Sequence, residues 1–141
     1  MRKELDDKLV KKYPKIFADR YGDKRETCMC WGFSCGDGWY WLIDQLCSNL
    51  QWNTDQNNKN GEYPQVVASQ VKEKFGGLCF YVKSATPEQY AQIHFAESMS
   101  RHICESCGTT KNLGQTSGWI KVLCEDCSKD QKHPWKKNEE D

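Results

Sequence analysis

Four cysteines in the C-terminal third of the chain have the residue type and spacing of a metal-binding site. Residues 104 to 127 read CESCGTTKNLGQTSGWIKVLCEDC, so Cys104-x2-Cys107 and Cys124-x2-Cys127 are separated by sixteen residues. Zn²⁺ prefers four tetrahedral thiolate or imidazole ligands, and each CxxC turn can supply two thiolates to the same ion. The spacing therefore predicts one zinc ion held by these four cysteines.

The same ligand set indicates a structural role for the metal. A site with four cysteine ligands has no coordination position for a substrate water, whereas catalytic zinc sites keep one open. A short segment of this kind buries little core, and a structural zinc ion supplies about 10–16 kcal/mol in isolated peptides. An iron–sulfur cluster and a redox-active dithiol pair are the competing interpretations. The paired CxxC spacing, with a predicted strand at 119–123 between the pairs, favours zinc.

A second group of cysteines lies in the segment TCMCWGFSCGDGW, residues 27 to 39. Cys28, Cys30 and Cys35 form no CxxC pair, so a second metal site would need a further ligand from Cys47, Cys79 or a histidine. A reactive thiol would need a base, a cation or a helix N-terminus to lower its pKa. Free cysteine is among the most buried residue types. We therefore favour a packed cluster of thiols and aromatic rings, with a second metal as the alternative.

Few side chains remain for catalysis. The histidines His94, His102 and His133 are the only three in the chain, and no nucleophile, base and orienting group can be assembled from the order of the residues. We expect a protein without catalytic residues, and a zinc- or thiol-dependent enzyme is the alternative.

Hydrophobic periodicity and turn residues predict the elements that position these cysteines. Apolar residues recur at helical spacing near the N-terminus, after Asp37 and after Thr86, and both of these residues are expected N-caps. Runs of β-forming residues on both sides of Gly76 and Gly77 predict a hairpin. The expected elements are helices at 2–13, 39–51 and 86–103, a polar loop at 53–64, a hairpin within 66–84 and the ribbon.

The predicted fold class is thus α+β, with three helices, a small antiparallel hairpin or sheet and a C-terminal four-cysteine zinc ribbon. We expect an α+β domain over residues 1–103, which includes the cysteine- and tryptophan-rich loop, and the ribbon over 104–128. Residues 129–141 carry mixed charge with little to pack except Trp135, so we expect a mobile tail.

Two tryptophans of the second predicted helix are the candidate partner-binding residues. Trp41 and Trp52 are eleven residues apart, close to three helical turns, and lie off the apolar stripe that contains Leu42 and Leu46. They are either covered by another element or available to a partner. Because monomers seldom expose large apolar patches, we expect them to be covered.

Composition limits the classes of function. The chain has 20 Lys and Arg against 20 Asp and Glu, and this neutrality weakens the case for nonspecific nucleic-acid binding. Nucleic-acid binding through the ribbon, with contacts from Lys111, Trp119 and Lys121, is the alternative function. The charged N-terminal segment has no signal-peptide pattern, and no stretch is apolar enough for a membrane span. We therefore expect a cytoplasmic protein without a membrane partner.

Three strings of the sequence resemble small uncharacterised proteins of tailed bacteriophages and prophages. They are TCMCWGFSCGDGWYWLIDQLC, QVKEKFGGLCFYV and CESCGTT followed by GWIKVLCEDC, and the resemblance runs from about Lys11 to Cys127. The last ligand is often histidine in that group, and Cys127 preserves zinc ligation here. The resemblance implies a viral origin and the host-cell cytoplasm, with no catalytic residues to transfer. It favours stoichiometric binding to a host protein, as in an anti-defence inhibitor.

Overall fold

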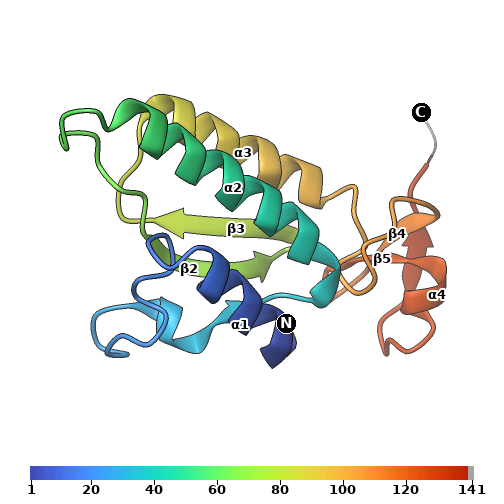
Figure 1. The fold of residues 1–141 in the computed structure, drawn as a ribbon. Helices are drawn as coiled ribbons and strands as arrows, with labels where there is room; N and C mark the ends of the chain where they lie inside the picture. The colour runs from blue at the N-terminus through green and yellow to red at the C-terminus, as the bar shows by residue number, and fades with distance from the viewer. Residues whose placement is uncertain (140–141) are drawn as a thin grey trace.

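Helices and strands are mixed along the chain, and the computed structural model describes residues 1 to 139. The helices are α1 (Lys3–Lys12), α2 (Tyr40–Asn57), α3 (Pro87–Ser100) and the short α4 (Glu125–Ser128), with 3-10 turns at Cys28–Trp31 and Asp37–Trp39. The strands are β1 (Phe33–Ser34), β2 (Ala68–Lys74), β3 (Gly77–Val82), β4 (Leu113–Thr116), β5 (Val122–Cys124) and β6 (Trp135–Lys137). This α+β composition, with a four-cysteine cluster near the C-terminus, confirms the predicted fold class (Figure 1).

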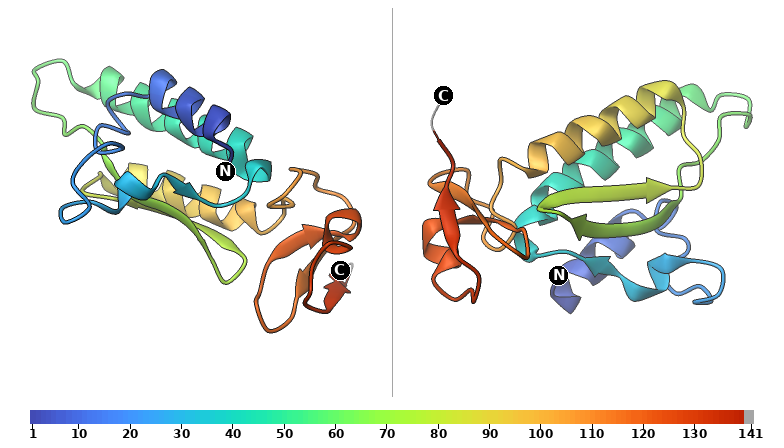
Figure 2. Two further views of the ribbon diagram at one scale, coloured as in Figure 1. Left: turned by 90° about the horizontal axis from the view of Figure 1, so that it is seen from below. Right: turned by 180° about the vertical axis from the view of Figure 1, so that it is seen from behind.

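The first sheet has the strand order β1-β2-β3. Strands β2 and β3 form the predicted antiparallel hairpin, and β1 adds to β2 in parallel, with Phe33 opposite Val71. Figures 1 and 2 show α2 and α3 antiparallel to each other over one face of this sheet. The core lies between the helices and the sheet. Side chains with no exposed surface include Leu9, Ile16, Met29, Trp39, Ile43, Cys47, Leu50, Val66, Ala68 and Val71.

Helix α3 begins as its sequence predicts and closes one edge of the sheet. The Thr86 hydroxyl accepts from Gln89 N, and the Gln89 side chain accepts from Thr86 N, which is a reciprocal capping box. Further along, Ser100 Oγ accepts from Leu78 N at 2.9 Å and Glu97 Oε2 accepts from Phe80 N at 2.9 Å. Two N–H groups on the outer edge of β3, those of Leu78 and Phe80, are therefore paired with side chains of α3.

A buried polar cluster joins α1 to α2. The Tyr13 hydroxyl is 2.7 Å from Asp44 Oδ1 and 2.9 Å from Asp44 O, and Lys12 Nζ is 2.8 Å from the same carboxylate oxygen. Both Tyr13 and Asp44 are buried. The lysine holds the pKa of Asp44 below its ordinary value against the opposing effect of burial, and the hydroxyl adds to this lowering.

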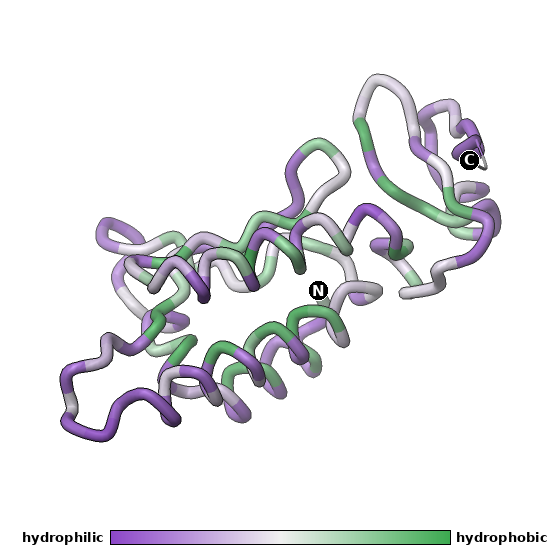
Figure 3. Tube along the Cα trace, turned by 90° about the horizontal axis from the view of Figure 1, so that it is seen from above, coloured by the Kyte–Doolittle hydropathy of each residue, from purple (hydrophilic) through white to green (hydrophobic). Residues whose placement is uncertain are grey.

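The start and the end of α2 differ from the prediction. Asp37 does not cap the helix, because its carboxylate accepts from Arg2 N at 2.7 Å and pairs with Arg2 Nε at 3.0 Å. The helix continues to Asn57, six residues beyond the expected end, and Asn57 Nδ2 donates to Asn53 O at 2.8 Å along this last turn. The polar loop therefore begins later, and Figure 3 shows it as the mostly hydrophilic segment after α2.

The second sheet has the order β5-β4-β6 and includes part of the expected tail. Strand β6 pairs with β4, with Trp135 opposite Thr116, and Trp135 Nε1 donates to Leu123 O at 3.0 Å. The indole lies over Gly114, where a Cβ atom would collide with the ring. The prediction of a mobile tail is therefore wrong for Trp135–Lys137, because the free edge of β4 and Gly114 receive this strand. Residues 140 and 141 lie outside the described residues.

Candidate metal centre and binding surface

The four ribbon cysteines come together at one point. The sulfur atoms of Cys104, Cys107, Cys124 and Cys127 all lie within 4.8 Å of one another, and Cys107 Sγ and Cys124 Sγ are 3.8 Å apart. A tetrahedral zinc site with Zn–S bonds of about 2.3 Å has sulfur–sulfur distances of about 3.8 Å. The donor set therefore fits one tetrahedral metal ion, and the predicted cluster is confirmed.

Each CxxC pair is held by its own backbone turn. Gly108 N donates to Cys104 O at 2.9 Å, and Cys104 N donates to Thr109 O at 2.8 Å. Gly108 has φ +82°, so this first turn uses the left-handed conformation that glycine adopts at least cost. The second pair begins where β5 ends, and Cys127 N donates to Cys124 Sγ at 3.5 Å. A sulfur that accepts backbone hydrogen bonds is prepared to carry negative charge.

The electrostatics of the four thiols favour a cation among them. Burial raises the pKa of Cys104, but backbone N–H groups of Cys107, Cys124 and Ser106 lower it, and the net pKa is below the ordinary value. Burial and the neighbouring Cys124 raise the pKa of Cys127 to about 12. Thiolates this close repel one another, so all four can ionise together when a positive ion compensates them.

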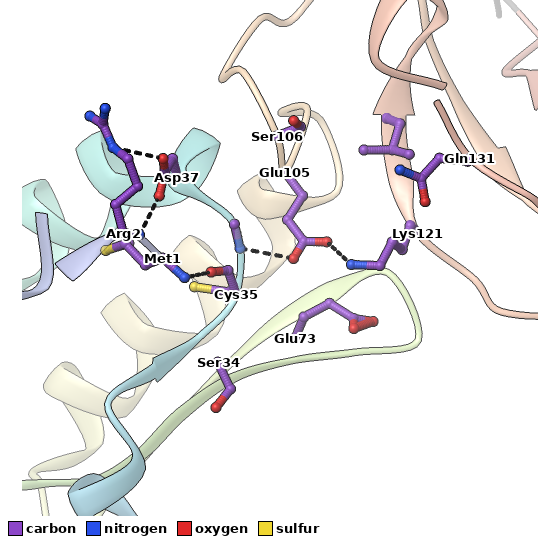
Figure 4. A pocket seen from close by; sticks show the side chains of 12 residues that line it. Met1, Arg2, Ser34, Cys35, Asp37, Glu73, Glu105, Ser106, Lys121 and Gln131 are labelled. Atoms are coloured by element: carbon purple, nitrogen blue, oxygen red, sulfur yellow. Dashed lines mark hydrogen bonds and ion pairs between the residues drawn. The ribbon is translucent and has the colours of Figure 1, made fainter. Parts of the chain in front are cut away.

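The first CxxC turn is docked onto the glycines of CGDGW. Gly38 N donates to Glu105 O at 2.8 Å, and Gly36 N donates to Glu105 Oε2 at 3.0 Å (Figure 4). A Cβ atom on Gly38 would lie 2.6 Å from Glu105 O and closer still to Cys104 O. Because Gly36 and Gly38 have no side chain, the backbone of CGDGW can approach the backbone of the first CxxC turn this closely. Sequence reasoning missed Glu105, although its position between two ligands was a usable signal.

Glu105 lines a polar cleft between the α+β domain and the ribbon, with a volume of about 510 Å³. Lys121 Nζ is 3.2 Å from Glu105 Oε1, and Figure 4 shows this pair together with the ion pair between Arg2 and Asp37. The amino group of Met1 donates to the backbone carbonyls of β1 and of the residue that follows it. The cleft thus holds two ion pairs, and the Glu73 carboxylate, which also lines it, accepts from Gly76 N at 3.1 Å.

The three cysteines of TCMCWGFSCGDGW are not brought together as a cluster. Cys28 is exposed, Cys30 is half-buried and donates its thiol to Thr27 O at 3.3 Å, and Cys35 is buried. Within residues 1–139, the ribbon cysteines are the one group of three or more residues arranged to hold a metal. The expectation of a packed thiol cluster is therefore wrong for Cys28 and holds for Cys35, which belongs to the core, and a second metal gains no geometric support.

The chemistry of Cys35 does not suit a nucleophile. Burial raises its pKa to about 12, and the carboxylates of Glu105 and Asp37 add to the increase, although the N-terminal amino group opposes it. The packing interpretation holds for Phe33 and Trp39, which are buried in the core next to Cys35. It is wrong for Trp31, whose side chain points to solvent and is 68% exposed.

Trp41 and Trp52 are exposed, so the expectation that another element covers them is wrong. Trp41 is 65% exposed and Trp52 is 63% exposed, and both lie on the face of α2 opposite its buried stripe. Neighbouring α3 adds Phe95, which is 69% exposed. Gln89 Nε2 donates to Thr54 Oγ1 at 3.0 Å, and this contact fixes the register of the two antiparallel helices. Phe95 is consequently level with the part of α2 between the two tryptophans.

We call Trp41, Trp52 and Phe95 the aromatic helix face. Sequence reasoning missed Phe95, but its position off the buried stripe of Ile93 and Ala96 could have revealed it.

The candidate nucleic-acid contacts do not form one surface. Lys111 precedes β4 and Trp119 follows it, so they lie at opposite ends of the ribbon sheet. Lys121 is bound to Glu105 in the cleft. Trp119 is exposed at the tip of the β4–β5 hairpin, and Lys111 is exposed at the other end of the sheet.

The fold and the cysteine cluster define the class: an α+β protein with a C-terminal ribbon that can hold one metal ion. Comparison of the chain with protein-family models, curated proteins and solved structures gave no match. Among residues 1–139, no helix combines the length and the apolar character that crossing a bilayer requires.

Proposed function

We propose that this protein acts by stoichiometric binding to a partner protein through the aromatic helix face. The observation that carries the proposal is the exposure of Trp41, Trp52 and Phe95 on two adjacent, well-packed helices. Tryptophan is the residue type most enriched among interface side chains that dominate binding energy. In the setting that the sequence resemblance implies, the partner is a protein of the host cytoplasm and binding inhibits a defence system.

The size of the aromatic helix face suits such a contact. An aromatic side chain buries about 150–250 Å² when it is covered, so three that are about two-thirds exposed offer on the order of 300–500 Å². Specific interfaces bury roughly 800 Å² on each partner. The three rings would supply the central half of such an interface, with polar neighbours such as Gln45 and Ser48 completing it.

The metal in this proposal is one structural Zn²⁺ ion. Residues Cys104, Cys107, Cys124 and Cys127 would hold it, and a closed thiolate set favours zinc over the harder divalent ions. The ion would supply folding free energy to a module whose own core contains few buried apolar side chains. Elemental analysis of protein purified without added metal tests this, with one zinc per chain as the expected result.

The partner-binding test compares tryptophans of equal exposure on different faces. Trp41→Ala with Trp52→Ala should reduce capture of the partner from an extract of host cells, and purified partner should then bind the wild type with one-to-one stoichiometry. Trp31→Ala is the matched control, because Trp31 is similarly exposed but lies outside the aromatic helix face. Melting temperature and metal content should be unchanged in all variants. Equal capture by the double variant and the wild type would contradict the proposal.

A further inference from the structure

Two hairpin tips, one from each sheet, meet at a small groove. The turn of the β2–β3 hairpin carries Phe75, which is 67% exposed, and the tip of the β4–β5 hairpin carries Trp119, which is 64% exposed. The two tips are in contact, since a Cβ atom on Gly76 would lie 3.2 Å from Ile120 Cγ2 (Figure 2). Both aromatic residues line a groove of about 220 Å³, which we call the inter-hairpin groove.

The backbone at Phe75 is unfavourable for its residue type. Lys74 pairs with Gly77, so Phe75 and Gly76 form a two-residue turn, and their φ angles are +51° and +81°. Such turns strongly prefer Asn, Asp or Gly at the first position, because a bulky side chain is strained at positive φ. Phe75 therefore carries backbone strain and leaves an aromatic ring in water. Strain of this kind concentrates at functional sites.

The inter-hairpin groove carries a net positive charge, because two lysines and one glutamate line it. Lys72 and Lys74 line it, and neither side chain forms an ion pair with another residue in 1–139. Lys74 Nζ lies 5.7 Å from the centre of the Phe75 ring. Glu73, which also lines the groove, accepts from Gly76 N at 3.1 Å through its carboxylate and supports the turn. Two free ammonium groups beside two exposed rings match a ligand that has both anionic groups and flat aromatic faces.

We propose that the inter-hairpin groove binds single-stranded nucleic acid. Bases would stack on Phe75 and Trp119, and the phosphates between them would lie against Lys72 and Lys74, which is the combination that single-strand-binding surfaces use. A paired duplex keeps its bases stacked on one another, so it cannot offer their faces to these rings. This site is separate from the aromatic helix face, and it replaces the ribbon surface around Lys111 as the nucleic-acid contact.

The test uses the full chain and a fluorescein-labelled ten-nucleotide oligo(dT), followed by anisotropy at low salt. Phe75→Asn and Trp119→Ala should each weaken binding by about 5- to 150-fold, the range for loss of one stacked base. Asn is well suited to the first position of this turn, so Phe75→Asn should fold at least as stably as the wild type. Lys74→Gln should reduce the slope of log K against log salt by about 0.7, the value for one single-strand phosphate contact. Lys111→Gln and Trp41→Ala are the controls and should bind like the wild type.

Three outcomes would overturn this assignment. One is that the wild type does not bind the oligonucleotide at low salt. Another is that a duplex or a glutamate-rich decapeptide binds as tightly as the single strand, since the ligand would then be recognised by charge alone or would be a protein segment. The third is that Phe75→Asn and Trp119→Ala bind as well as the two controls, since the groove would then play no part.

Discussion

Because Gly38 is in close contact with the first CxxC turn, the substitution Gly38→Ala, which adds one methyl group, should lower the free energy of unfolding substantially. In Gly38→Ala, the new Cβ atom would start 2.6 Å from Glu105 O and from Gly108 N, and both are backbone atoms that cannot rotate away. Reaching an ordinary separation of 3.4 Å from these two atoms requires a retreat of about 0.8 Å, and Cys104 O, which is closer still, requires more. The hydrogen bond from Gly38 N to Glu105 O, now 2.8 Å, would break.

The expected cost of Gly38→Ala follows from these two effects. A lost hydrogen bond costs about 0.5–1.5 kcal/mol and an overpacked contact about 1–3 kcal/mol, so we expect a loss of about 2–4 kcal/mol in unfolding free energy. For a chain of this length the melting temperature should fall by about 6–15 °C. Urea unfolding with metal bound measures this directly.

The control is Gly61→Ala in the loop after α2. Gly61 has φ +72° but nothing lies within 4 Å of its Cβ position, so this variant carries backbone strain without a collision and should lose only about 1 kcal/mol. If Gly38→Ala unfolds within about 0.5 kcal/mol of the wild type, the ribbon is not held against the α+β domain by this approach, and the reasoning is refuted.

Three further predictions concern the metal and the buried titratable groups. Removal of the metal by a strong chelator should unfold the ribbon, seen as a loss of amide protection in residues 104–139, while most of the α+β domain keeps its protection. Burial and the Asp44 carboxylate raise the pKa of Tyr13 to about 12. This contribution to stability is complete below pH 10 and lost from pH 10 to 12, so over that range the wild type should lose on the order of 2–3 kcal/mol more than Tyr13→Phe. An equal loss in both proteins would contradict this assignment. Iodoacetamide at neutral pH should label exposed Cys28 well before buried Cys35, and peptide mass spectrometry would reveal the reverse order.

Local signals allowed the metal cluster and most elements to be predicted. The CxxC pairs, the Thr86 start of α3 and the β2–β3 hairpin each depend on residues close in sequence, so their presence can be predicted from the chain itself. The hairpin was predicted on both glycines, but positive φ falls on Phe75 and Gly76. Residue type alone did not reveal that Phe75 occupies a strained position.

The errors arose where distant segments compete for the same group. Asp37 is a suitable N-cap by type, but Arg2, which is thirty-five residues away, takes its carboxylate. The tail appeared unable to pack, but the open edge of β4 receives Trp135. The segment that contains CGDGW was assigned to a packed cluster of thiols and aromatic rings, but Gly36 binds Glu105, which is 69 residues away. Such contacts join residues that are far apart in the chain, so local sequence patterns do not reveal them.

The outer edge of β3 has a consequence for self-association. An edge strand with unpaired N–H groups is a template on which another chain can add a strand, and repeated addition leads to fibrils. Here the N–H groups of Leu78 and Phe80 are already bound by Ser100 and Glu97, and the Glu97 carboxylate also places a negative charge along that edge. Helix α3 therefore hinders the addition of a strand from another chain to β3. This protection comes from side chains of the same chain and needs no partner.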